Sequence, residues 1–292
     1  MQFQTPVDIQ AAPFCILPTD RLLFVGSCFA SEIGHRFAVN QFRAVVNPFG
    51  TMYNPASILH TLQRYIPANE PPDVVVLTLG TNHVYIFKET GEIVDNCQKQ
   101  PAALFREEEL TVQQCEDYLQ QSIDLLRQKN PHVRIIITVS PIRYAKYGFH
   151  GSQLSKATLL LAVHQLLTNS QKCKNKATSI NPSSFILHPS SFILHQVYFP
   201  AYEILNDELR DYRFYKADML HPSEQAVDYI YERFAATFFA PETHQFVAEW
   251  QPISQALAHK PLHPDSQEYR EFIEQTNNRL QAFRKKYGLF HE

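Results

Sequence analysis

The sequence predicts an α/β fold built on a doubly wound parallel sheet of about five strands, in three α/β/α layers. Continuous apolar runs at 22–25, 73–79 and 133–139 are typical of strands that are buried on both faces. Segments with helical spacing of apolar residues separate these runs, and alternating strands and helices favour a parallel sheet. The carboxyl ends of the strands then share one edge, where such folds form their sites.

Composition narrows the class of protein. The chain has 292 residues, of which 45% are hydrophobic and 19% charged, as expected for a globular protein with a sizeable core. A net charge of −3, with both signs mixed along the chain, predicts neither a nucleic-acid partner nor a membrane partner. The amino terminus lacks the pattern of a signal peptide, and the five cysteines are scattered without a C-x-x-C pair. We therefore expect a cytoplasmic protein with no metal and no cofactor.

The first strand and helix meet in a tight turn. The apolar run 22–25 ends at Gly26, and Phe29, Ile33 and Phe37 then recur at helical spacing. The Ser27-Cys28 pair therefore lies between the carboxyl end of a strand and the amino end of a helix, where free N–H groups favour a developing negative charge. Taken alone, this turn favours a buried structural cysteine, and the remainder of the chain changes that interpretation.

The other elements follow in chain order. We expect a short strand at 42–46, a helix at 55–66 capped by Asn54, the strand at 73–79, a helix from Thr111 with a Gln114 capping box, the strand at 133–139, a helix at 152–167, a short strand at 197–199, a helical segment at 202–210 and a helix opened by Pro222. Residues 84–109 are predicted to be a polar, irregular excursion with a small hairpin across 89–92.

We expect one α/β domain at 1–240 and a helical C-terminal extension at 241–292, either packed on that domain or serving as an oligomerisation arm. The segment 169–195 is unusual because it contains the heptad Pro-Ser-Ser-Phe-Ile-Leu-His twice in tandem, from 182 and from 189. Two copies of seven residues cannot build a solenoid, and prolines break a coiled coil. We therefore interpret 169–195 as a duplicated insertion in a surface loop.

Four residues suit nucleophilic acyl transfer, which needs a nucleophile, a base and a group that orients the base. Cys28 or Ser27 is the candidate nucleophile. His221 is the candidate base, and Asp218, three residues earlier, is placed to orient the imidazole.

Further polar residues follow the predicted strands. The side-chain amide of Asn82 and the backbone N–H groups of Gly50 and Cys28 are candidate donors to an oxyanion. His83 is a candidate substrate-binding residue or second acid or base, and a hydrogen-bonded structural role is the alternative. Arg143 is a candidate ligand for a substrate carboxylate or phosphate, and pairing with a surface group is the alternative.

The motif Gly-Ser-Cys-Phe-Ala at 26–30 resembles the name-giving motif of the GSCFA-domain family, which belongs with the SGNH (GDSL-like) hydrolases. Over residues 20 to 240 the blocks agree in order. Residues 26–28 resemble Gly-Asp-Ser, and Gly50 stands for the glycine of the second block. Residues 80–83 resemble Gly-x-Asn-Asp, and 218–222 contain Asp-x-x-His. The resemblance implies an esterase or thioesterase that works through an acyl-enzyme, on a small-molecule or glycan ester.

The sequence departs from the family pattern at two places. Cys28 stands where the nucleophilic serine is expected, with Ser27 in the place of the aspartate, and His83 replaces the aspartate after Asn82. We expect the Cys28 thiolate to be favoured by the helix amino end and by a neighbouring histidine. The departures also leave open a catalytically inactive binding protein. An acyltransferase that uses the same residues is a third possibility, and the substrate and the oligomeric state stay open.

Overall fold

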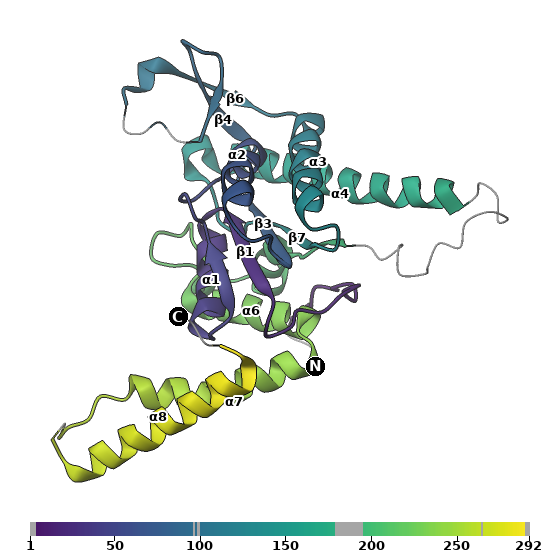
Figure 1. Ribbon diagram of the computed structural model, residues 1–292. Coiled ribbons are helices and arrows are strands. Elements are labelled where there is room, and N and C mark those ends of the chain that lie inside the picture. Colours follow the sequence, from purple (N-terminus) through teal and green to yellow (C-terminus); the bar gives the residue numbers. More distant parts are fainter. Residues whose placement is uncertain (1–3, 96, 98–99, 179–194, 264, 290–292) are drawn as a thin grey trace.

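The computed structural model describes residues 4–95, 97, 100–178, 195–263 and 265–289 (Figure 1). A five-stranded sheet forms the centre, with strands in the order β2-β1-β3-β7-β8 and every neighbouring pair parallel. Its strands are β1 (Arg21–Gly26), β2 (Arg43–Val46), β3 (Val74–Leu79), β7 (Arg134–Val139) and β8 (Gln196–Tyr198). The predicted fold class is confirmed, and each strand lies within two residues of its expected bounds.

Helices cover both faces of this sheet (Figure 1). Side chains of β1 alternate between two cores: Leu22 and Phe24 belong to one, and Leu23 and Val25 to the other. The first core packs α1 (Cys28–Val39) and α6 (Glu224–Phe238) on the sheet. The second packs α2 (Pro55–Tyr65), α3 (Val112–Lys129) and α4 (Gly148–Thr178). Two apolar faces explain why the strands are continuously hydrophobic.

Helix starts follow local sequence signals. Asn54 caps α2 by accepting a hydrogen bond from Ser57 N at 2.9 Å, and Thr111 and Gln114 form the expected capping box of α3. Shorter turns complete the chain: 3-10 turns at Ile66–Ala68, Ala102–Leu104, Ala145–Tyr147 and Tyr212–Phe214, helix α5 (Ala201–Glu203) and a π-helical turn at Ile204–Glu208.

Helix α4 is longer than expected and corrects the boundary of the duplicated segment. It runs to Thr178, so residues 169–178 are helical rather than part of a loop. This stretch contains three lysines and no proline or glycine, so it holds no strong helix breaker. The tandem heptad lies outside the described residues except for its last histidine.

A second, antiparallel sheet corrects the expectation of an irregular excursion at 84–109. It has the order β5-β4-β6, from β4 (His83–Phe87), β5 (Ile93–Val94) and β6 (Phe105–Glu109). The hairpin across 89–92 is confirmed as the β4–β5 connection. Strand β6 escaped prediction because it reads Phe-Arg-Glu-Glu-Glu, and its charged residues are exposed.

Helices α7 (Pro241–Ala258) and α8 (Gln267–Tyr287) lie side by side and extend away from the central sheet (Figure 1). Trp250 of α7 packs against the ring of Phe283 of α8, and its Nε1 donates to Val39 O at the end of α1, at 2.8 Å. The extension thus contacts the α/β part, while the division at residue 240 stays a prediction. None of the helices in the described ranges combines the length and the apolar character needed to cross a bilayer.

Candidate active site

The turn between β1 and α1 separates the two candidate nucleophiles. Gly26 adopts φ +142°, and a Cβ there would lie 2.1 Å from the carbonyl oxygen of Thr78, so only glycine allows this approach to β3. Ser27 is fully buried, and its Oγ lies 3.2 Å from Thr78 Oγ1. Cys28 is the first residue of α1 and is partly exposed. The turn therefore directs the serine into the protein and the cysteine toward the surface.

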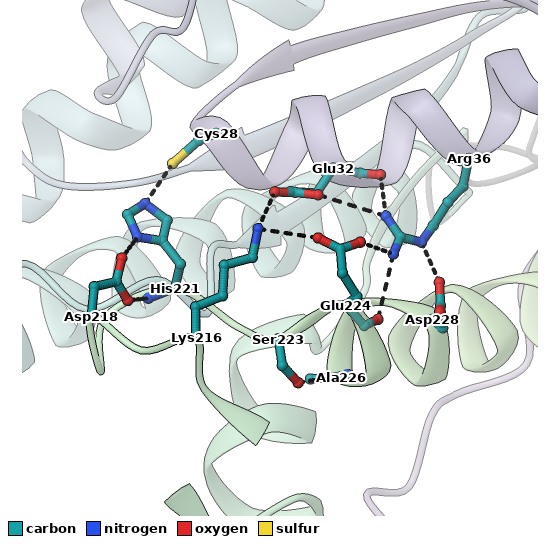
Figure 2. Close-up of polar contacts among 10 residues, drawn as sticks. All are labelled: Cys28, Glu32, Arg36, Lys216, Asp218, His221, Ser223, Glu224, Ala226 and Asp228. Atoms are coloured by element: carbon teal, nitrogen blue, oxygen red, sulfur yellow. Dashed lines mark hydrogen bonds and ion pairs between the residues drawn. The ribbon is translucent and has the colours of Figure 1, made fainter. Parts of the chain in front are cut away.

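Cys28, His221 and Asp218 form a hydrogen-bonded series (Figure 2). The Cys28 Sγ lies 3.5 Å from His221 Nε2, and on the other side of the ring His221 Nδ1 lies 2.6 Å from Asp218 Oδ2. With Nδ1–H donating to the carboxylate, Nε2 is left to accept the thiol proton. This is the geometry of a nucleophile, a base and an orienting acid.

A tight hairpin holds the histidine and the aspartate. Tyr215 and Pro222 pair as an antiparallel bridge, and Lys216 N donates to His221 O at 2.8 Å. We call residues 215–222 the histidine hairpin. Asp218 Oδ1 accepts from the backbone N–H groups of Leu220 and His221, at 2.9 and 3.0 Å. The carboxylate that orients the imidazole thus also closes the turn beneath it.

Electrostatics differ between the two ends of the series. The backbone N–H groups of His221 and Leu220, and then the His221 ring, lower the pKa of Asp218 to about 2. Burial raises the pKa of the Cys28 thiol above its ordinary value, and the nearby Glu32 carboxylate adds to this. The expected preference for the thiolate is therefore wrong, because desolvation outweighs the N–H groups at the start of α1. A neutral thiol needs His221 as a general base, as a triad serine does.

An ion-pair network ties the histidine hairpin to α1 and α6 (Figure 2). Lys216 Nζ lies 2.9 Å from Glu32 of α1 and 3.2 Å from Glu224 of α6. Arg36 continues the network to Glu224 at 3.0 Å and to Asp228 at 2.7 Å. Because Glu32 lies one turn after the cysteine, this network sets the hairpin against the helix that carries the nucleophile.

Two of the three expected oxyanion donors, those of Gly50 and Asn82, are engaged elsewhere. Gly50 is exposed, and its N–H donates to Asn47 O at 2.9 Å. The buried Asn82 donates from Nδ2 to Leu110 O at 2.8 Å, and its Oδ1 has no hydrogen-bond partner among the described residues. Backbone N–H groups of Cys28 and Phe29 instead face the sulfur, and as first-turn groups of α1 they have no carbonyl partner within the helix.

Arg143 supports the histidine hairpin. Its Nη1 donates to Met219 O at 3.0 Å, and its backbone N donates to Leu220 O at 3.0 Å. The guanidinium stacks on Phe149 at 4.0 Å. Arg143 also borders a cavity of about 300 Å³, so a substrate contact remains compatible with its position.

His83 lies in the small sheet rather than beside the thiol–imidazole pair. Its ring stacks on Tyr147 with centroids 3.6 Å apart, and burial lowers the pKa of its imidazole. This environment favours the structural alternative for His83. Its role in substrate binding stays a proposal.

Sequence reasoning missed one residue at the floor of the site. Lys156 of α4 is buried, and its Nζ donates to Gly80 O at 2.6 Å and to Ser140 O at 2.8 Å, linking the loops after β3 and β7. The available signal was its helical spacing with Leu159 and Val163, which places a lysine on the apolar face of the helix. These contacts bring together two of the loops at the carboxyl edge of the sheet, where the sequence predicts a site.

The GSCFA family model matches residues 21–73 and 68–234, and a model described as the C-terminal domain of GSCFA domain proteins matches residues 250–291. The chain belongs to the GSCFA family. No curated protein matches it. The family match confirms the resemblance carried by the Gly-Ser-Cys-Phe-Ala motif.

Several solved structures resemble this GSCFA protein. One is a serine-to-alanine mutant of an acetyl esterase with acetate ion, at 11% identity and a TM-score of 0.42, covering 78% of this chain and 98% of that one. A second is described as a putative platelet activating factor from Streptococcus pneumonia. It has 14% sequence identity and a TM-score of 0.39, and the match covers 74% of this chain and 84% of that one. A third is a carbohydrate esterase family 3 protein from Talaromyces cellulolyticus. It has 10% sequence identity and a TM-score of 0.37, and the match covers 78% of this chain and 98% of that one. At these values the likeness carries no information about activity.

Proposed function

We propose that this GSCFA protein is an acyl hydrolase that cleaves an ester or a thioester through a covalent acyl-enzyme on Cys28. The observation that carries the proposal is the continuous series from Cys28 Sγ to His221 at 3.5 Å and from His221 to Asp218 at 2.6 Å. Ser27 is the weaker candidate, because its hydroxyl is buried against Thr78.

In the proposed cycle, the Cys28 sulfur attacks the substrate carbonyl carbon while His221 Nε2 takes the thiol proton. The N–H groups of Cys28 and Phe29 are the proposed donors to the oxyanion, since they lie at the positive end of α1. His221 then protonates the leaving alcohol or thiol as its bond to the acyl carbon breaks. Water, deprotonated by His221, attacks the thioester and releases the acid, and the thiol regains its proton. Asp218 stabilises the imidazolium in both steps.

Hydrolysis of short p-nitrophenyl esters and matched thioesters tests the proposal. We expect Cys28→Ala and His221→Ala to abolish turnover and Ser27→Ala to retain most of it. Mass spectrometry of the wild type during turnover should show one acyl adduct on the peptide that contains Cys28. Turnover that survives in Cys28→Ala and disappears in Ser27→Ala would move the nucleophile to the serine.

The matched experiment with an added alcohol separates hydrolysis from acyl transfer. An acyl hydrolase releases free acid at a rate that is independent of the alcohol, whereas an acyltransferase forms a new ester in proportion to it. Absence of both turnover and adduct across the ester and thioester series would contradict the proposal and favour a binding protein. A small-molecule or glycan ester as substrate, and a cytoplasmic location, remain part of the proposal.

A further inference from the structure

Lys156 is a buried lysine for which the proposed cycle has no use. Its side chain is 2% exposed, and the partners of its Nζ in the described part of the chain are two carbonyl oxygens, those of Gly80 and Ser140. No carboxylate of the described residues pairs with it. Lysine is rarely buried without an opposite charge, because its ammonium loses hydration. Its position at the carboxyl ends of β3 and β7 therefore suggests a role at the site.

The lysine lies directly behind the nucleophile turn. Gly80, which accepts its shortest hydrogen bond, packs against Ser27 so closely that an added Cβ would lie 3.4 Å from the Ser27 Cβ. The same added atom would lie 2.9 Å from the Tyr144 hydroxyl. That hydroxyl is buried and has no hydrogen-bond partner within the described ranges.

Charged and titratable groups face this pair from each neighbouring element. Around the thiol are Glu32 of α1, His221 of the histidine hairpin and the Tyr53 phenol. Around the amine are the rings of Tyr144 and Tyr202, whose centroids lie 5.6 and 5.9 Å from Nζ. Among these groups the Lys156 ammonium favours the thiolate, and the Glu32 carboxylate opposes it.

We propose that Lys156 is a positioning residue whose ammonium, held by the carbonyl groups of Gly80 and Ser140, stabilises the Cys28 thiolate against the cost of its burial. The inference rests on the proposed role of Cys28 as nucleophile. In this proposal two groups act on the Cys28 thiol: His221 takes its proton, and the buried Lys156 ammonium stabilises the resulting thiolate. The hydrogen bonds to the two carbonyl groups fix the ammonium between the loops that follow β3 and β7.

The proposal gives a specific pH dependence. Burial lowers the pKa of the Lys156 amine to about 7, so the lysine is charged below that pH and neutral above it. The electrostatic stabilisation of the thiolate by Lys156 is therefore present at pH 6 and lost by pH 9. If Lys156 acted only through its hydrogen bonds, replacing it would change the reactivity of Cys28 by the same factor at both pH values.

Alkylation by iodoacetamide measures the thiolate without any substrate, because the sulfur displaces iodide and forms a C–S bond. We compare Lys156→Met, which lacks charge and donors, with Lys156→Gln, which keeps two N–H donors without the charge. For Cys28 we expect both variants to react about tenfold more slowly than the wild type at pH 6 and at an equal rate at pH 9. The exposed Cys15 provides an internal reference whose rate should not change. Lys156→Gln reacting like the wild type at pH 6 would overturn the proposal.

A second measurement keeps the buried lysine intact. The coupling between two sites is reciprocal, so an anion at position 28 must raise the pH at which Lys156 titrates. Cys28→Asp supplies that anion, and Cys28→Asn is the neutral control. In protein labelled with ¹³C-lysine, we expect the Lys156 midpoint to be about one pH unit higher in the Asp variant. Equal midpoints would contradict the coupling. Because neither measurement needs hydrolysis, an inactive protein that shows both effects overturns only the proposed function.

Discussion

The two halves of the candidate site are built on different physical principles. The histidine hairpin is exposed, with 44% of the Asp218 side chain and 39% of the His221 side chain accessible, and ion pairs tie it to α1. The floor under the nucleophile turn is buried: Ser27 Oγ pairs with Thr78 Oγ1 there, and Lys156 Nζ donates to the carbonyl groups of Gly80 and Ser140. Exposed ion pairs contribute little to stability, whereas buried polar groups are costly to leave unpaired. We therefore expect changes in the hairpin to alter activity first and changes in the floor to alter stability first.

After the loss of Cys28 or His221 themselves, the largest expected effect on activity is at Asp218. Asp218→Asn keeps an oxygen that can close the turn but removes the charge that favours the imidazolium, so kcat should fall by about 10³-fold or more. Thermal unfolding should move by no more than a few degrees, since the side chain is exposed. A kcat within a factor of about three of the wild type would show that His221 acts without its carboxylate.

The largest expected effect on stability is at Gly26. Gly26→Ala places a Cβ against the backbone oxygen of Thr78 at φ +142°, so we expect a loss of about 3 kcal/mol in the free energy of unfolding. Gly50→Ala is the matched control, because Gly50 also has positive φ but no atom within 4 Å of the added Cβ. Urea unfolding of both variants measures the difference. Equal losses would mean that the contact with β3 is not tight.

A smaller effect is expected for the ion pairs of the hairpin. Lys216→Met removes the pairs with Glu32 and Glu224, and Lys286→Met removes a similar exposed pair with Glu249 in the C-terminal extension. Both variants should unfold at temperatures close to that of the wild type, because exposed ion pairs contribute little to stability. Only Lys216→Met should lower kcat/KM, by several-fold, because it loosens His221 relative to α1. A similar loss of activity in Lys286→Met would contradict the positional role of the network.

Among the residues of the site, the smallest expected effect on activity is at Ser27. Ser27→Ala leaves Thr78 Oγ1 without its partner and should cost about 1 kcal/mol of stability. Its kcat should stay within about threefold of the wild type, because the serine hydroxyl points into the protein and away from His221. Ester hydrolysis and chemical unfolding of the same preparation give both values. A loss of turnover larger than that of Cys28→Ala would reverse the assignment of the nucleophile.

Local patterns predicted the central sheet and its helices well. Apolar runs such as 73–79 mark strands buried on both faces, and caps such as Asn54 and Thr111 mark helix starts within one residue. The small sheet was missed because β6 pairs through its backbone while its side chains stay charged and exposed. Strand pairing of this kind depends on a partner elsewhere in the chain and leaves no hydrophobic pattern.

The sequence alone determined the family and the order of the motifs, and it nominated Cys28, His221 and Asp218 as candidate site residues, because these depend on residue type and spacing. The tertiary structure decided which of Ser27 and Cys28 faces the imidazole, since one turn of backbone points neighbouring side chains in opposite directions. It also decided that burial disfavours the Cys28 thiolate and that Lys156 lies behind it. Desolvation and contact distances are properties of packed neighbours far apart in the chain, so no local pattern contains them.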